Sequence, residues 1–249
     1  MKALVLCGGF GTRLGALCTE RPKPLLEVGQ LALVEHTLLR LSAAGLNDVC
    51  VNLHFGAEQL QARLGDGSRY GVRLEYFAET SLLGTAGTPR ALALALRAGE
   101  QGLLVHYGDV LSEHPLGELV ARHAASGARA RIVIHERAGS NSRVVLGAGD
   151  RVERFLERPS AGAAADASAS HWAFSGICVL SRACLLSLPD APGADLPRDV
   201  FPALAAAGQL FAERHVGYRC AVDSPARLES ARDAWKTGAL TLPSHREVT

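Results

Sequence analysis

Short apolar runs that alternate with helical segments constrain the fold of this chain more than any other feature. The runs at residues 3–6, 49–53 and 103–106 are typical of buried strands. Between them, residues 33–44 and 58–64 have the spacing of amphipathic helices. This pattern predicts an α/β fold: a Rossmann-like, mostly parallel mixed sheet with helices on both faces, in a single domain. Ligands of such sheets bind beyond the carboxyl ends of the strands.

The first strand opens into a glycine-rich loop that suits an anion. Three of the four residues at positions 8–11 are glycines, which let backbone N–H groups approach a phosphate without side-chain clash. Arg13 and Lys23 add positive charge, so the segment fits the polyphosphate of a nucleotide. The alternative is a tight strand-to-helix turn with incidental charges. A P-loop is excluded because Thr12 and Arg13 follow Gly11, and Leu14 stands where a dinucleotide fingerprint needs its third glycine.

Two aspartates follow predicted strands and are candidate metal ligands. Asp109 comes after the strand at 103–106, and Asp223 follows the apolar residues 220–222, which end the strand predicted at 218–222. Carboxylates held by rigid backbone suit Mg²⁺, which binds one or two of them together with substrate phosphates and water. The alternatives are a turn residue capping the next helix for Asp109, and a helix-start signal for Asp223, which Ser224 and Pro225 follow.

Composition limits the classes of partner. With 249 residues, 48% of them hydrophobic, the chain can form a large core, and its net charge of +1 argues against nucleic-acid or membrane binding. No window resembles a transmembrane span or a signal peptide, so we expect a cytoplasmic protein. The six cysteines form no C-x-x-C pair, which predicts buried reduced thiols rather than a zinc site.

Later segments add weaker expectations. Residues 143–146 and 152–156 predict a hairpin. Residues 160–170 are small and polar, which predicts a loop. Residues 89–98 predict a helix with proline in its first turn. We find no internal repeat and no linker between two independent cores.

Taken together, seven segments resemble the sugar-1-phosphate nucleotidyltransferases, also called sugar-nucleotide pyrophosphorylases. They occur in the order of that family and cover almost the entire chain. The segments are Leu6-Cys7-Gly8-Gly9-Phe10-Gly11-Thr12-Arg13-Leu14, Pro22-Lys23-Pro24-Leu25, Leu83-Gly84-Thr85-Ala86-Gly87, Tyr107-Gly108-Asp109, Phe155-Leu156-Glu157-Arg158-Pro159, Phe174-Ser175-Gly176-Ile177 and Tyr218-Arg219-Cys220-Ala221-Val222-Asp223-Ser224-Pro225.

The resemblance implies a reaction between a nucleoside triphosphate and a sugar 1-phosphate that releases pyrophosphate. It implies catalytic roles for Arg13, Lys23 and Asp109, and a Mg²⁺ ion on Asp109 and Asp223. The nucleotide-binding residues it implies are Leu6, Gly8, Gly9, Gly11, Thr12, Arg13, Glu79, Gly84, Thr85 and Gly87. The sugar-binding residues it implies are Glu157, Arg158, Ser175 and Gly176. One domain would span residues 1–240, with its nucleotide-binding part at about 1–130 and its sugar-binding part at about 131–240, followed by a tail at 241–249.

The resemblance also ranks the substrates. The Leu-Gly-Thr-Ala-Gly segment at 83–87 looks most like mannose- and heptose-1-phosphate guanylyltransferases, which favours GTP. Thymidylyl, uridylyl or cytidylyl transfer, a non-sugar phosphate acceptor and a non-catalytic regulatory subunit stay open. Arg158 departs from the lysine common in the family, and Phe174 replaces a polar residue common there. These departures favour a heptose, an amino sugar or a cyclitol-like phosphate over plain glucose or mannose. The alternative for Phe174 is that it packs in the core. The sequence is compatible with a homo-oligomer.

Overall fold

The computed structural model describes residues 1–137, 140, 142–158 and 171–243. They form two compact units whose segments interleave along the chain. Unit 1 comprises Met1–Leu82, His106–Gly117 and Val216–Thr249, and unit 2 comprises Leu83–Val105 and Glu118–His215. The predicted division near residue 130 stays a prediction. No helix of the described residues is long and apolar enough to cross a membrane.

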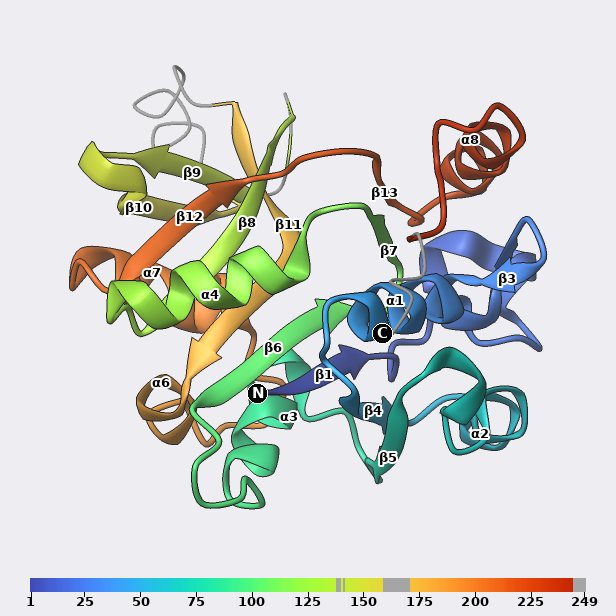
Figure 1. Cartoon of the computed structure of the whole chain (residues 1–249), viewed down its shortest axis with the longest axis horizontal. Helices are drawn as coiled ribbons and strands as arrows, with labels where there is room; N and C mark the ends of the chain where they lie inside the picture. Colours follow the sequence, from blue (N-terminus) through green and yellow to red (C-terminus); the bar gives the residue numbers. More distant parts are fainter. Residues whose placement is uncertain (138–139, 141, 159–170, 244–249) are drawn as a thin grey trace, which may run out of the picture. The chain divides into compact units, whose positions relative to one another are not determined.

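Unit 1 is built on three parallel strands: β1 (Lys2–Leu6), β4 (Asp48–Leu53) and β5 (Arg73–Ala78) (Figure 1). Leu6 pairs with Asn52, and Asn52 pairs with Phe77. The carboxyl ends of all three strands therefore lie at one edge, where the predicted glycine loop begins.

Helices and two short ladders complete unit 1. The helices are η1 (Thr12–Cys18), η2 (Lys23–Leu25), α1 (Leu33–Ala43), α2 (Ala57–Leu64), η3 (Ser68–Tyr70) and α8 (Pro225–Lys236). The ladders are β2 (Glu27–Val28) with β3 (Leu31–Ala32), and β7 (Val110–Ser112) with β13 (Arg219–Ala221), both antiparallel.

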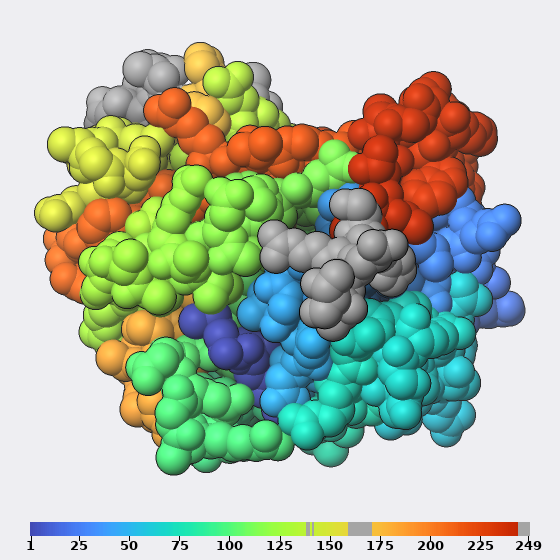
Figure 2. Space-filling view, viewed as in Figure 1, coloured from blue at the N-terminus to red at the C-terminus, as the bar shows by residue number. Residues whose placement is uncertain are grey.

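Helix α8 packs one face against the β2–β3 hairpin and exposes the other. Leu228 and Ala231 are buried in a cluster that includes Val28, and the opposite face forms red surface in Figure 2. Gly29 has φ +67°, and a Cβ there would lie 2.3 Å from the indole nitrogen of Trp235. Only glycine therefore fits both the turn and the approach of the helix.

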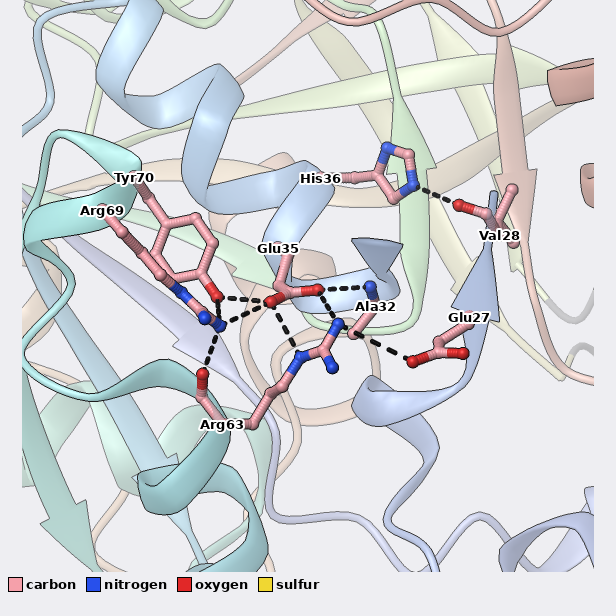
Figure 3. Close-up of polar contacts among 8 residues, drawn as sticks. All are labelled: Glu27, Val28, Ala32, Glu35, His36, Arg63, Arg69 and Tyr70. Atoms are coloured by element: carbon pink, nitrogen blue, oxygen red, sulfur yellow. Dashed lines mark hydrogen bonds and ion pairs between the residues drawn. The ribbon is translucent and has the colours of Figure 1, made fainter. Parts of the chain in front are cut away.

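A buried carboxylate joins the first turn of α1 to two neighbouring elements (Figure 3). Glu35 is 2% exposed and accepts hydrogen bonds from Arg63 of α2 at 2.8 and 2.9 Å, and from Arg69 of η3 at 2.8 Å. Tyr70 and the amide of Ala32 also donate to it. Burial raises the pKa of Glu35, but the hydrogen bonds from Arg63, Tyr70 and Ala32 outweigh it and hold the pKa below 4.5.

Unit 2 contains a mixed sheet. Strand β8 (Ala130–Glu136) pairs with β12 (Leu210–Arg214) in parallel and with β11 (Trp172–Ser181) in antiparallel orientation. Strand β11 also neighbours β6 (Gly102–Tyr107), within which the boundary of the units falls. Strands β9 (Ser142–Leu146) and β10 (Val152–Glu157) form the predicted hairpin.

The described part of unit 2 also contains helical segments, and Phe201 of one of them belongs to a small aromatic cluster. The helical segments are α3 (Gly84–Ala93), α4 (Leu116–Ser126, whose first two residues belong to unit 1), η4 (Ala148–Asp150), α6 (Arg182–Leu186), the π-helix η5 (Leu196–Val200) and α7 (Phe201–Ala206). The ring of Phe201 lies 5.2 Å from those of Phe155 and Phe174. This contact matches the core-packing alternative for Phe174.

Some expectations from sequence need correction. The helix predicted at 89–98 is wrong in its bounds, because α3 already begins at Gly84 and ends at Ala93, with Pro89 inside it. Hydrogen bonds to a neighbouring segment, described below, override the low helix propensity of the glycines there. All six cysteines are free and buried, as predicted. The predicted loop at 160–170 lies outside the described residues.

Candidate functional site

The glycine loop of unit 1 connects β1 to η1. Gly11 has φ +66°, and a Cβ there would lie 3.0 Å from Cys18 Sγ and 3.1 Å from Lys23 Cβ. A Cβ on Gly9 would have no atom within 4 Å, so this side of Gly9 faces open space. Glycine is thus required at position 11 by geometry, whereas at position 9 it leaves the backbone accessible to a ligand.

The first two amides of the loop are used within the protein. Asn52 Oδ1 accepts hydrogen bonds from Cys7 N at 2.6 Å and from Gly8 N at 3.2 Å. Asn52 Nδ2 donates to Oε1 of the buried Glu79 at 2.9 Å. The predicted contact of the Gly8 amide with a phosphate would therefore have to compete with Asn52, while the positions from Gly9 onward lie beyond this clamp.

The β7–β13 ladder places the two predicted metal ligands at the same end. Val110 pairs with Ala221, Asp109 immediately precedes β7, and Asp223 follows β13 by two residues. The amide of Val222 donates to the carbonyl of Asp109 at 2.9 Å. Two carboxylates that are 114 positions apart in the sequence are thus held on neighbouring backbone.

Cations surround these carboxylates. Lys23 Nζ lies 2.5 Å from Asp109 Oδ2, with the lysine side chain 11% exposed. A guanidinium nitrogen of Arg13 lies 3.5 Å from Asp223 Oδ2, and Arg227 Nε lies 3.5 Å from Asp223 Oδ1. The structure therefore brings together all four charged residues predicted from the sequence, and it adds Arg227 to them.

The donor set around Asp109 and Asp223 fits magnesium. Both ligands are hard carboxylate oxygens, and the described residues contain no cluster of three or more His, Cys, Asp or Glu side chains that could form a complete protein cage. Mg²⁺ is commonly held by one or two carboxylates and completes its shell with phosphate oxygens and water. The arrangement is suited to a metal that arrives with a polyphosphate.

In unit 2, the predicted base-binding segment at 84–87 forms the first turn of α3. Thr85 Oγ1 donates to Asp195 Oδ2 at 2.9 Å and accepts from Leu196 N at 2.8 Å. Gly84 has φ +86°, and a Cβ there would lie 2.2 Å from the carbonyl oxygen of Ala194. This segment is therefore locked onto residues 193–196, and its contacts with a base stay a prediction.

The predicted sugar-binding residues of unit 2 differ in accessibility. The pKa of Glu157, at the end of β10, is raised mainly by burial and next by the charge of Asp195. The charges of Arg158 and Arg198 lower it by less. Arg158 is 79% exposed at its side chain and has φ +46°. Shifted pKa values are common at functional sites, so Glu157 stays a candidate, and its contact with sugar stays a prediction.

Ser175 and Gly176 lie in an irregular part of β11. Ser175 is fully buried, and its hydroxyl lies 3.1 Å from His135 Nδ1. Gly176 has φ +84° where the register with β8 shifts, which explains the glycine. The structure thus gives both residues a role in shaping the strand, and their contact with sugar stays a prediction.

Comparisons with known proteins identify the family and the fold. A model of the nucleotidyl transferase family matches residues 2–220. Mannose-1-phosphate guanyltransferase of Schizosaccharomyces pombe is 33% identical over 231 residues, covering 90% of this chain and 61% of that protein. The catalytic subunit beta of mannose-1-phosphate guanylyltransferase from Xenopus tropicalis is 32% identical over 230 residues, covering 90% of this chain and 62% of that protein. The chain thus spans less than two thirds of the length of these relatives.

A solved structure shows the fold. A Bacillus anthracis protein assigned as a glucose-1-phosphate thymidylyltransferase superposes with a TM-score of 0.82 at 19% sequence identity. The match covers 99% of this chain and 98% of that one. It confirms the predicted fold class, a mostly parallel mixed α/β sheet with helices.

Proposed function

Because this chain belongs to the nucleotidyl transferase family, we propose that it transfers a nucleotidyl group from a nucleoside triphosphate to a sugar 1-phosphate. The observation that carries the proposal is the gathering of Arg13, Lys23, Asp109 and Asp223 beside the glycine loop. Two cations and two carboxylates in this arrangement suit a triphosphate with its metal. The proposed partners are these two substrates, with no nucleic acid or membrane.

The reaction needs no side-chain nucleophile. A phosphate oxygen of the sugar 1-phosphate attacks the α-phosphorus of the triphosphate, the bond from the α-phosphorus to the bridging oxygen breaks, and pyrophosphate leaves with that electron pair. Catalysis then consists of positioning the two phosphates and neutralising charge in the transition state. Backbone amides from Gly9 to Thr12 would hold phosphate oxygens, Lys23 would contact the reacting phosphate, and Arg13 would neutralise the leaving pyrophosphate.

Asp109 and Asp223 would hold Mg²⁺, which would neutralise part of the charge on the phosphates. The protein contributes the fixed orientation of the two carboxylates. The β7–β13 ladder sets their backbone, and Arg227 holds Asp223 from the side of α8 while donating to the carbonyl of Ala221 at 3.0 Å.

For the substrates, we propose GTP and a mannose- or heptose-like 1-phosphate. The support is the names of the relatives from Schizosaccharomyces pombe and Xenopus tropicalis, which are guanylyltransferases of mannose 1-phosphate. Glu157, with its raised pKa, would accept hydrogen bonds from sugar hydroxyls. Arg158 would bind the sugar phosphate in place of the more usual lysine. A non-catalytic subunit is disfavoured because all four charged residues are present and lie close together.

The test is a magnesium-dependent assay of pyrophosphate release. Each of the four ribonucleoside triphosphates and dTTP is crossed with a panel of sugar 1-phosphates that includes mannose and manno-heptose. We expect release with GTP and one sugar, none in EDTA, and strongly reduced release in the Asp109→Asn variant. Release with another triphosphate would overturn the base while keeping the reaction. Silence across the panel despite nucleotide binding would favour a non-catalytic subunit or a non-sugar acceptor.

A further inference from the structure

Asn52 lies where the three parallel strands of unit 1 end. It is the next-to-last residue of β4, it pairs with Leu6 of β1 on one side and with Phe77 of β5 on the other, and it is 4% exposed. An amide side chain that is almost completely buried among apolar strand residues must have hydrogen-bond partners to be tolerated.

Both ends of this amide are engaged, and its orientation is fixed by its partners. Cys7 N and Gly8 N are both donors, so the group facing them must be the oxygen Oδ1. The nitrogen Nδ2 therefore faces Glu79, whose carboxylate oxygen accepts at 2.9 Å. The side chain thus links the ends of β1, β4 and β5.

The fit of the loop against Asn52 is tight. A Cβ on Gly8 would lie 2.9 Å from Asn52 Nδ2 and 3.2 Å from the side chain of Leu82. Gly8 has no side chain, so its backbone can approach closely enough to donate to Oδ1. The chain then turns toward Gly9, Phe10 and Gly11, which follow the clamped residues directly.

We propose that Asn52 is a positioning residue for the phosphate-binding loop. By holding Cys7 and Gly8, it sets the direction in which the backbone from Gly9 to Thr12 leaves β1, and Glu79 holds Asn52 in turn. The loop is then ordered before the ligand arrives, so less conformational freedom is lost on binding. The inference rests on the proposed function, because it assigns the phosphates of the triphosphate to this loop.

The experiment measures calorimetric binding of two probes by the full chain with Mg²⁺: GTP, and tripolyphosphate, which has no base. Asn52→Leu removes all three hydrogen bonds without adding charge. In the Asn52→Asp and Glu79→Gln pair, the donor and acceptor roles are exchanged and the net charge is that of the native pair. Asn47→Ala, at an exposed asparagine in the same unit, is the matched control.

We expect Asn52→Leu to lower the affinity for both probes by about tenfold, since the loss of one to two hydrogen bonds that order the loop corresponds to that factor. The KM for the triphosphate should rise, and the KM for the sugar 1-phosphate should stay unchanged. Asn52→Asp alone should bind both probes weakly. The double variant Asn52→Asp with Glu79→Gln should recover an affinity within about threefold of the native value. Asn47→Ala should bind both probes as the native chain does.

Other outcomes overturn the inference. Native affinity in Asn52→Leu would do so, as would weaker binding of GTP alone, because the effect would then concern the base. If Asn52→Leu does not fold, the exchanged pair decides, and its failure to recover relative to Asn52→Asp counts against the inference. A native chain that binds neither probe would instead overturn the proposed function, and the inference with it.

Discussion

The contact between Lys23 and Asp109 is the most informative one at the scale of single residues. Taking a lysine ammonium almost completely out of water is costly unless a charge compensates it. Here the carboxylate of Asp109 compensates it at 2.5 Å. A triphosphate carries more negative charge than one carboxylate, so it can draw the ammonium toward itself. The pair thus keeps the lysine ordered and close to the place where we propose that the phosphate binds.

We therefore expect Lys23→Met and Asp109→Asn each to lower kcat/KM by about 100-fold or more, because each removes a charge that the transition state requires. The two variants should differ in detail. Lys23→Met should weaken nucleotide binding with little change in metal dependence, whereas Asp109→Asn should raise the Mg²⁺ concentration needed for half-maximal rate. Titrations of rate against nucleotide and Mg²⁺ separate them.

The control for this pair is Arg21→Met, which removes an exposed cation two residues from Lys23. It should stay within about twofold of the native rate, as expected for a surface charge outside the site. A Lys23→Met enzyme with near-native kcat/KM would contradict the role of this lysine.

The same scale shows what sequence reasoning could and could not reach. Arg13, Lys23, Asp109 and Asp223 were predictable because their residue types carry the chemistry and because short motifs surround them. Asn52 was not predicted, since its contacts with Cys7 and Gly8 span 45 and 44 positions and depend on strand register. Its only signal is that it is a polar residue in the otherwise apolar run at 49–53. Arg227 is signalled only by its spacing of four residues from Asp223 on α8.

At the scale of elements, periodic segments were predicted well and short ones were missed. Helix α1 was predicted at 33–44 and ends at Ala43, since its apolar spacing directly reflects its burial. Strands β2, β3 and β7 have only two or three residues, which is too few to show a period. They form because of tertiary contacts, and β7 nevertheless positions Asp109.

The Glu35 network is the clearest stabilising contact between elements (Figure 3). Glu35→Gln should lower the free energy of unfolding by about 2–3 kcal/mol at pH 7, because it removes one partner of a buried charge network whose arginines are partly exposed. The pKa of Glu35 is lowered in the folded state, so its contribution is complete above pH 4.5 and is lost as the pH falls through the folded-state value. Denaturant unfolding at several pH values measures this.

Glu58→Gln is the matched control, because Glu58 is an exposed carboxylate on α2. It should change the free energy of unfolding by no more than about 0.5 kcal/mol. The difference between the native chain and Glu35→Gln should shrink below pH 4.5. A difference that stays constant from pH 7 to pH 3 would show that packing, rather than charge, explains the effect.

At the scale of the whole molecule, we expect buried histidines in both units to lower the stability of the fold in mild acid. Burial lowers the pKa of His106 in unit 1 and of His123 in unit 2 from 6.5 to about 4. Burial also lowers the pKa of His36. The unfolded chain therefore binds these protons first, so stability is complete above pH 6.5 and falls as the pH decreases toward 4. The carboxylate contribution of Glu35 is lost only at lower pH, which separates the two effects.

His123 offers the cleanest test because it belongs to unit 2, whereas the proposed catalytic residues belong to unit 1, and because it is 5% exposed. A pKa of about 4 against 6.5 corresponds to at most about 3 kcal/mol between pH 7.5 and pH 4. His123→Gln should therefore flatten the decline of the unfolding free energy over this range by up to that amount, although it lowers stability at pH 7.5 through lost packing. The exposed His171, changed to Gln, should leave the profile unchanged. If the unfolding free energy of His123→Gln declines as steeply with falling pH as that of the native chain, protonation of His123 does not drive acid unfolding.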